Sequence, residues 1–146
     1  MKESLTIVVP IYNEEENIER LCKELSDFIK KSIVETQILF INDGSIDDSE
    51  KLINNQCNTN DKFKSLSFKK NSGLSAAIKA GFDYTNTSLV GYIDADLQTD
   101  PEDFNLLLNK ISDYDLVTGV RTKRKDSLVK NISSLIANSC LLYTSP

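Results

Sequence analysis

The sequence of 146 residues contains no histidine and no tryptophan, and its three cysteines lie far apart, at Cys22, Cys57 and Cys140. Without histidine, a zinc site built from cysteine and histidine is excluded, and three separated cysteines do not form the pattern of a disulfide framework. A metal ion in this protein would therefore need oxygen ligands, which favours Mg²⁺ or Mn²⁺. The side chain that most often serves as a general base is also missing.

The sequence also lacks any long hydrophobic run. No stretch approaches the roughly 20 apolar residues needed to span a bilayer, and the start, MKESLTIVVP, does not have the form of a signal peptide. With 40% apolar and 27% charged residues, the composition is that of an ordinary soluble domain. We therefore expect one domain with a proper core, by default in the cytosol.

The net charge of −5 argues against non-specific binding to nucleic acid. The charge is unevenly distributed, because the segment from Arg121 to Lys130 holds five basic residues and one acid. This segment carries +4 and the rest of the chain −9. Such a basic patch is either a solvated surface or the binding site of an anionic partner.

Apolar runs and helical spacings alternate along the whole chain. Short apolar runs predict strands at Leu5–Val9, Gln37–Ile41, Ser65–Phe68, Leu89–Ile93 and Asp115–Val120. Between them we expect a helix capped by Asn13 with Glu16, a short helix starting at Asp47 with Glu50, a helix over Ser75–Tyr84, and a helix opened by Pro101. This alternation predicts an α/β fold, with a mostly parallel sheet and helices on both faces.

A polar cluster follows each predicted strand. In chain order, the clusters read PIYNEE, NDGSIDD, KKNSG, DADLQTD and GVRTKRKD. Ligands of open parallel sheets bind outside the carboxyl ends of the strands, so we expect these loops to form one cleft.

The DADLQ cluster has the donors of a site for a hard divalent cation. Asp94 and Asp96 project to the same side of an extended backbone, and the amide oxygen of Gln98 continues that side. Two carboxylates and an amide suit a metal that also binds phosphate oxygens. The simpler reading is that the acids favour a helix start. It accounts for Asp100, Glu102 and Asp103 but not for Asp94, Asp96 and Gln98.

The other clusters allow two readings each. Tyr12 can lie against a base while Glu14 accepts hydrogen bonds from a ribose or base, or both can belong to a helix start. The NSGLSAA turn can point amides at a phosphate, but we favour a tight turn into a helix that packs closely on the sheet. Arg121 can bind phosphate in a bidentate manner. The apolar residues that follow it suit a core helix or an anionic membrane surface.

The order of these motifs resembles glycosyltransferase family 2, and more narrowly the polyprenyl-phosphate and dolichyl-phosphate sugar synthases. The resemblance covers about Leu5 to Asn138, and DLQ-DP with the later G-x-R-x-x-R-x-D is its most specific part. It implies a GT-A fold and an enzyme that uses Mg²⁺ or Mn²⁺ and a nucleotide-diphosphate sugar, with inversion at the anomeric carbon. The donor would be a UDP- or GDP-sugar, because Tyr12 could stack on either base. The acceptor would be a polyprenyl phosphate at the cytosolic membrane face.

The resemblance also implies roles for individual residues. Asp96 and Gln98 would hold the metal, Asp96 and Arg121 would act in catalysis, and Arg124 would meet the acceptor phosphate. The nucleotide-sugar would contact Pro10, Tyr12, Glu14, Ile41, Asp43, Asp94, Ala95, Asp96, Gln98 and Arg121. Asn42 stands where the family often has a first aspartate.

Relatives continue beyond the basic segment, so we expect residues 1–140 to be a truncated GT-A domain and residues 141–146 an unmatched end. Two other functions stay open. One is a family relative that uses a saccharide hydroxyl as acceptor. The other is a non-catalytic, receiver-like module that binds Mg²⁺. A receiver needs a lysine at the end of a late strand, whereas Arg121 stands at the end of the fifth predicted strand here, which argues against this alternative.

Overall fold

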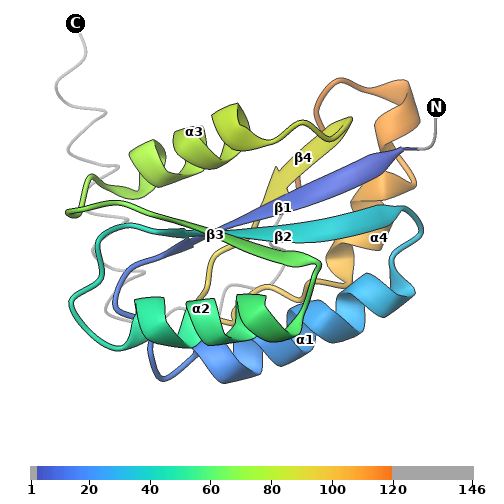
Figure 1. Cartoon of the computed structure of the whole chain (residues 1–146). Coiled ribbons are helices and arrows are strands. Elements are labelled where there is room, and N and C mark those ends of the chain that lie inside the picture. Colours follow the sequence, from blue (N-terminus) through green and yellow to red (C-terminus); the bar gives the residue numbers. More distant parts are fainter. Residues whose placement is uncertain (1–2, 120–146) are drawn as a thin grey trace, which may run out of the picture.

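The computed structural model describes residues 3–119, which form one sheet flanked by helices (Figure 1). None of the helices between these residues is long and apolar enough to cross a membrane. In chain order the elements are β1 Ser4–Ile11, α1 Ile18–Lys31, β2 Glu35–Asn42, α2 Ser49–Thr59, β3 Phe63–Ser67, α3 Leu74–Tyr84, β4 Leu89–Tyr92, α4 Asp103–Leu108 and the 3₁₀ turn η1 Ile111–Asp113.

The sheet is parallel throughout, in the order β3-β2-β1-β4. The central strand β1 pairs along its whole length with β2 and over four residues with β4. Its apolar run is buried on both faces, as a parallel strand between two helical layers requires. The chain builds outward from β1 through β2 to β3, then crosses back to place β4 on the other side.

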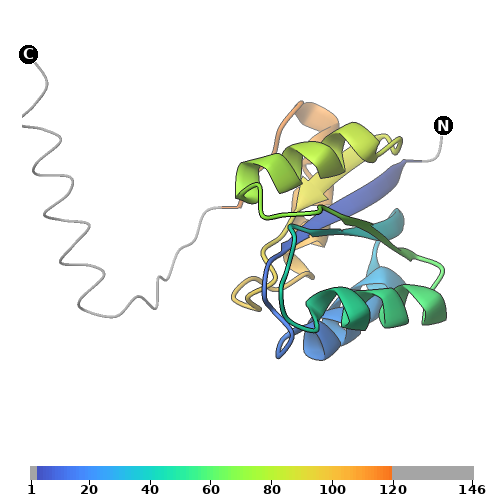
Figure 2. The same cartoon turned by 60° about the vertical axis from the view of Figure 1, so that its left-hand side comes forward.

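Helices cover both faces of the sheet, as predicted. Helices α1, α2 and α4 lie on one face and α3 lies on the other (Figures 1 and 2). The larger core lies under α1, whose apolar residues recur at helical spacing, and the rings of Phe28 and Phe104 join α1 to α4 with centroids 6.1 Å apart. The smaller core packs Ala77 of α3 against Val8, Leu39 and Ile41 of the sheet.

Two expectations about the elements are wrong. Helix α1 begins at Ile18 rather than after Asn13, because the Asn13 side chain is engaged by another loop and its backbone is left-handed, with φ 54°. No strand forms over residues 115–119, where Leu116 is 81% exposed and no backbone hydrogen bond joins these residues to a described strand. Val120, the last residue of that predicted strand, lies outside the described part.

Gly81 of α3 lets the helix approach the central strand. A Cβ at this position would lie 2.4 Å from Cγ1 of Val8, a side chain that is fully buried. The predicted close packing of small residues in this helix is therefore confirmed.

We expect Gly81→Ala to destabilise the protein by about 1–3 kcal/mol through overpacking, although alanine is the better helix former by about 1 kcal/mol. Denaturant unfolding measures the change, with Ser75→Ala at an exposed position of the same helix as the control. Adding Val8→Ala should recover part of the loss. A Gly81→Ala protein as stable as the wild type would show that the contact is not tight.

Candidate functional site

A pocket of about 350 Å³ opens at the carboxyl edge of the sheet. Residues from the loops after all four strands line it. The prediction that the polar clusters form one cleft is therefore confirmed for four of the five clusters. The fifth cluster, from Gly119 onward, lies almost wholly outside the described residues. The lining residues are Pro10, Ile11, Tyr12, Glu14, Asp43, Asn71, Gly73, Leu74, Ala77, Asp94, Ala95 and Asp96.

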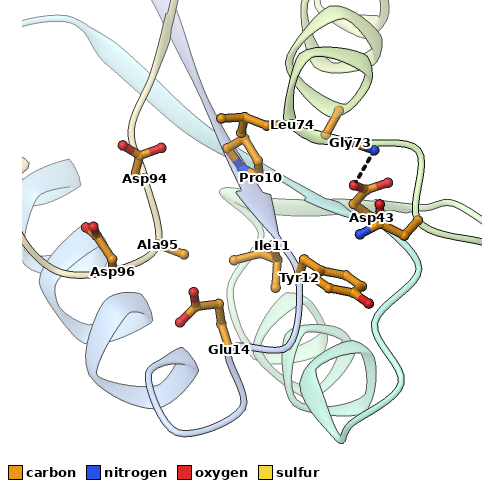
Figure 3. Close-up of a pocket in the computed structure, with 12 residues that line it drawn as sticks. Pro10, Ile11, Tyr12, Glu14, Asp43, Gly73, Leu74, Asp94, Ala95 and Asp96 are labelled. Carbon is orange, nitrogen blue, oxygen red and sulfur yellow. Dashed lines mark hydrogen bonds between the residues drawn. The ribbon is translucent and has the colours of Figure 1, made fainter. Parts of the chain in front are cut away.

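The strand order explains why the pocket lies here. The chain leaves β1 toward β2 on one side, whereas β4 joins β1 on the other side, so the loops after β1 and β4 diverge. Ligands of open α/β sheets bind at such a switch point. Tyr12 and Glu14 come from one of these loops, and Asp94 and Asp96 come from the other (Figure 3).

The pocket has two chemically different ends. Tyr12 and Asp43 lie toward one side of it, and the carboxylates of Asp94 and Asp96 lie toward the other (Figure 3). Tyr12 is 44% exposed, so its ring is available to a ligand, and it does not serve as a staple beside a helix cap as the simpler reading had it.

Hydrogen bonds between two loops hold Tyr12 and Glu14 in place. The Asn13 amide donates to Oγ of Ser45, and Oδ1 of Asn13 accepts from the amide of Ile46 at 2.9 Å. One residue further, the amide of Glu14 donates to Oγ of Ser49, also at 2.9 Å. The loop after β1 is therefore fixed at Asn13 and Glu14 to the loop after β2 and to the start of α2.

Asp47 extends this bracing. Its carboxylate accepts from the amides of Ser49, at 3.0 Å, and Glu15, at 3.2 Å. Burial alone would raise the pKa of Asp47, but the hydrogen bonds from Ser49 and Glu15 together outweigh it and lower the pKa below its ordinary value. Asp47 therefore lies near the helix start that the sequence predicted for it.

The loop after β4 leaves its acids open to the pocket. The amide of Gln98 donates to Oδ1 of Asp96 at 3.0 Å, and Leu97 between them is left-handed, with φ 59°. Among residues 3–119, no lysine or arginine forms an ion pair with Asp94 or Asp96. Both line the same pocket, and a cation bound there would interact favourably with both negative charges.

The neighbouring acids have structural partners, as the simpler reading predicted. Oδ1 of Asp100 accepts from the amide of Glu102, just before α4, and the carboxylate of Glu102 forms an ion pair with Lys31 at the end of α1. This ion pair raises the pKa of Lys31. These acids therefore belong to the start of α4, whereas Asp94 and Asp96 do not.

The pocket suits a divalent cation whose coordination shell is completed by a bound ligand. Within residues 3–119, no group of three or more acidic or cysteine side chains could hold a metal alone. Mg²⁺ and Mn²⁺ are commonly held by one or two carboxylates with waters and phosphate oxygens. Asp96 and Asp94 fit this arrangement. Gln98 does not line the pocket, so its predicted metal contact stays a prediction.

Other predicted residues lie in different surroundings. The Ile41 side chain is fully buried among Val8 and Ala77, so only its backbone could meet a ligand. Asn42 is also buried, and its side chain bonds the amide of Ser45 and the hydroxyl of Ser67. Asn42 thus has a structural role, which a neutral amide can fill at a position where the family often has an aspartate. The predictions for Arg121 and Arg124 lie outside the described residues.

For the loop between β3 and α3, the sequence favoured a structural turn over a phosphate-binding role and predicted no individual site residue. Asn71, Gly73 and Leu74 nevertheless form one wall of the pocket. The available signal was the position of the KKNSG cluster after a strand, but a turn into a helix explained the same residues.

Comparison with known proteins identifies the family. The sequence profile described as Glycosyl transferase family 2 matches residues 6–141. The chain belongs to this family. The resemblance read from the motifs is thereby confirmed, and a receiver-like module is not supported.

Two curated relatives share about a third of their residues with this member of glycosyl transferase family 2. The uncharacterized glycosyltransferase YkcC of Bacillus subtilis (strain 168) is 37% identical over 121 residues, which are 82% of this chain and 38% of YkcC. Undecaprenyl-phosphate 4-deoxy-4-formamido-L-arabinose transferase of Salmonella choleraesuis (strain SC-B67) is 34% identical over 142 residues, 96% of this chain and 43% of that protein. The chain thus spans about two fifths of the length of these relatives.

Solved structures confirm the fold. Glucosyl-3-phosphoglycerate synthase from Mycobacterium tuberculosis with UDP matches with a TM-score of 0.66 at 19% identity, over 93% of this chain and 50% of that one. S. aureus TarS with UDP matches with a TM-score of 0.63 at 20% identity, over 87% of this chain and 38% of that one. The mannosyltransferase PcManGT from Pyrobaculum calidifontis, in complex with GDP-Man and Mn²⁺, matches with a TM-score of 0.56 at 18% identity, over 70% of this chain and 30% of that one. The predicted α/β fold is that of nucleotide-sugar transferases.

Proposed function

We propose that this protein transfers a sugar, with inversion, from a UDP- or GDP-sugar to a polyprenyl or dolichyl phosphate at the cytosolic membrane face. The observation that carries the donor half is the pocket at the switch point, with the exposed ring of Tyr12 on one side and the carboxylates of Asp94 and Asp96 on the other. Neither carboxylate forms an ion pair with a lysine or arginine within residues 3–119. The family membership supports sugar transfer, and the relative named as an undecaprenyl-phosphate transferase supports the acceptor half.

The layout of the pocket matches the two ends of a nucleotide-diphosphate sugar. The base would lie against Tyr12, where Pro10 and Ile11 supply apolar surface. The diphosphate would lie toward Asp96, and a Mg²⁺ or Mn²⁺ ion between them would offset the charge that the leaving nucleoside diphosphate gains. Asp94 and Ala95 would line the nucleotide beside Asp96.

A phosphate acceptor fits the chemistry of the chain. A sugar hydroxyl needs a general base to become a nucleophile, and in this chain, which has no histidine, that base would have to be a carboxylate. A phosphate monoester has its second pKa near 6, so at pH 7 it is largely dianionic and needs no base. Arg121 would bind phosphate, and Arg124 would guide the acceptor beside an anionic bilayer.

The protein groups do their work mainly by holding the donor in place. The loop after β1, braced at Asn13 and Glu14, fixes the nucleoside end, and the turn at Leu97 directs Asp96 to the diphosphate. Aligning donor and acceptor in this way lowers the entropic part of the barrier.

Calorimetric titration of the full-length protein with UDP and with GDP tests the donor site. With Mn²⁺ present, we expect one of the two to bind, and EDTA should abolish binding. Asp96→Asn keeps the acceptor for the Gln98 amide but removes the charge, so it should weaken binding about tenfold or more, or about 1.4 kcal/mol.

The matched control is Asp100→Asn, which removes the same charge from the same loop and keeps the acceptor for the Glu102 amide. It should bind the nucleotide like the wild type. Equal losses in the two variants would mean that general charge, not a metal at Asp96, governs binding. Binding that survives EDTA would contradict the metal site.

Transfer of labelled sugar to a polyprenyl phosphate tests the acceptor. We expect Arg121→Ala and Arg124→Ala each to lower turnover about tenfold or more, because each removes a charge-assisted hydrogen bond to phosphate. Lys110→Ala, at an exposed position outside the basic segment, is the control. Unchanged turnover in both arginine variants would refute their role, and transfer to a saccharide hydroxyl alone would refute the lipid acceptor.

A further inference from the structure

Asp43 is an almost fully buried carboxylate at the end of β2. Its side chain is engaged by the loop that joins β3 to α3: Oδ1 accepts from the amide of Ser72 at 2.7 Å, and Oδ2 accepts from the amide of Gly73 at 2.9 Å. The bond to Gly73 is drawn in Figure 3. Hydrogen bonds to an ionised, buried acceptor are among the stronger ones in proteins. Both oxygens of Asp43 are thus used to hold a neighbouring loop.

Gly44 lets this loop lie directly on the end of β2. Its backbone is left-handed, with φ 67°, and a Cβ here would lie 2.4 Å from the carbonyl carbon of Lys70 and 2.6 Å from the amide nitrogen of Asn71. The backbone of the loop therefore touches the backbone of Gly44. Any side chain at this position would push the loop away.

The held loop is a wall of the pocket. Asn71 and Leu74 are both exposed side chains that line it, and they stand on either side of the two amides that Asp43 binds. No other hydrogen bond between described residues ties the amides of Ser72 or Gly73 to the sheet. The distance of this wall from Tyr12 thus depends on Asp43.

We propose that Asp43 is a positioning residue for nucleotide binding: it sets the β3–α3 loop so that Asn71 and Leu74 close the nucleoside end of the pocket. This inference rests on the proposed function, and it adds a role to the direct nucleoside contact expected from the family resemblance. The affinity for a nucleotide then depends on the position of the loop as well as on the carboxylate itself.

Two variants separate these roles. Asp43→Asn keeps one oxygen acceptor but turns the other position into a donor that faces an amide N–H. Gly44→Ala keeps the carboxylate and displaces the loop. Asp48→Asn, an exposed acid in the same β2–α2 loop, is the matched control.

Two readouts are taken on the full-length protein. Amide hydrogen exchange at Gly73 reports whether the loop is held, and calorimetry with Mn²⁺ and whichever of UDP and GDP binds the wild type reports affinity and stoichiometry. We expect Asp43→Asn and Gly44→Ala each to speed amide exchange at Gly73 and to raise the dissociation constant for the nucleotide about tenfold. The binding stoichiometry should stay near that of the wild type. Asp48→Asn should change neither.

Each result decides something. A merely structural defect would lower the stoichiometry and leave the dissociation constant unchanged, which would overturn the proposal. Gly44→Ala with faster exchange but wild-type affinity would also overturn it and would leave direct contact as the only role of Asp43. If the wild type binds neither UDP nor GDP, the proposed function fails, whereas wild-type exchange at Gly73 in Asp43→Asn would refute only the positioning role.

Discussion

The parallel pairing of β1 with β2 on one side and with β4 on the other is the constraint on which the site depends. Because all four strands run the same way, their carboxyl ends meet at one edge, and the reversal of strand order beside β1 opens the loops there. The apolar run of β1 makes this possible, since it is buried on both faces, and Gly81 lets α3 approach Val8 closely enough to seal the second face.

Hydrogen bonds between loops turn this edge into a defined pocket. Asn13 and Asp47 join the loop after β1 to the loop after β2, and Asp43 joins the end of β2 to the loop before α3. Polar side chains that might otherwise be read as ligand contacts therefore brace the backbone. Asp94 and Asp96 are different, because no described cation pairs with them, and in the proposed function a divalent cation bound with a diphosphate would supply that partner.

The sequence predicted what depends on local pattern and missed what depends on distant partners. Continuous apolar runs located the first four strands, and the spacing of Ile18, Leu21 and Leu25 located α1. The start of α1 was misplaced because Asn13 bonds Ile46, 33 residues away, rather than a nearby helical amide. A fifth strand was expected over residues 115–120 from composition alone, which does not show whether the segment will pair with a neighbouring strand, and residues 115–119 form none. The wall formed by Asn71 and Leu74 was missed for the same reason, since Asp43 holds it from another strand.

The most direct test of this account is a crystal structure of the full-length protein with Mn²⁺ and the nucleotide that binds. The account predicts an anomalous manganese peak in direct contact with the Asp96 carboxylate and a diphosphate oxygen, with the base against Tyr12. A manganese ion held elsewhere, for example among Glu14, Glu15 and Asp47, or a base bound away from Tyr12, would contradict the assignment of this pocket as the donor site.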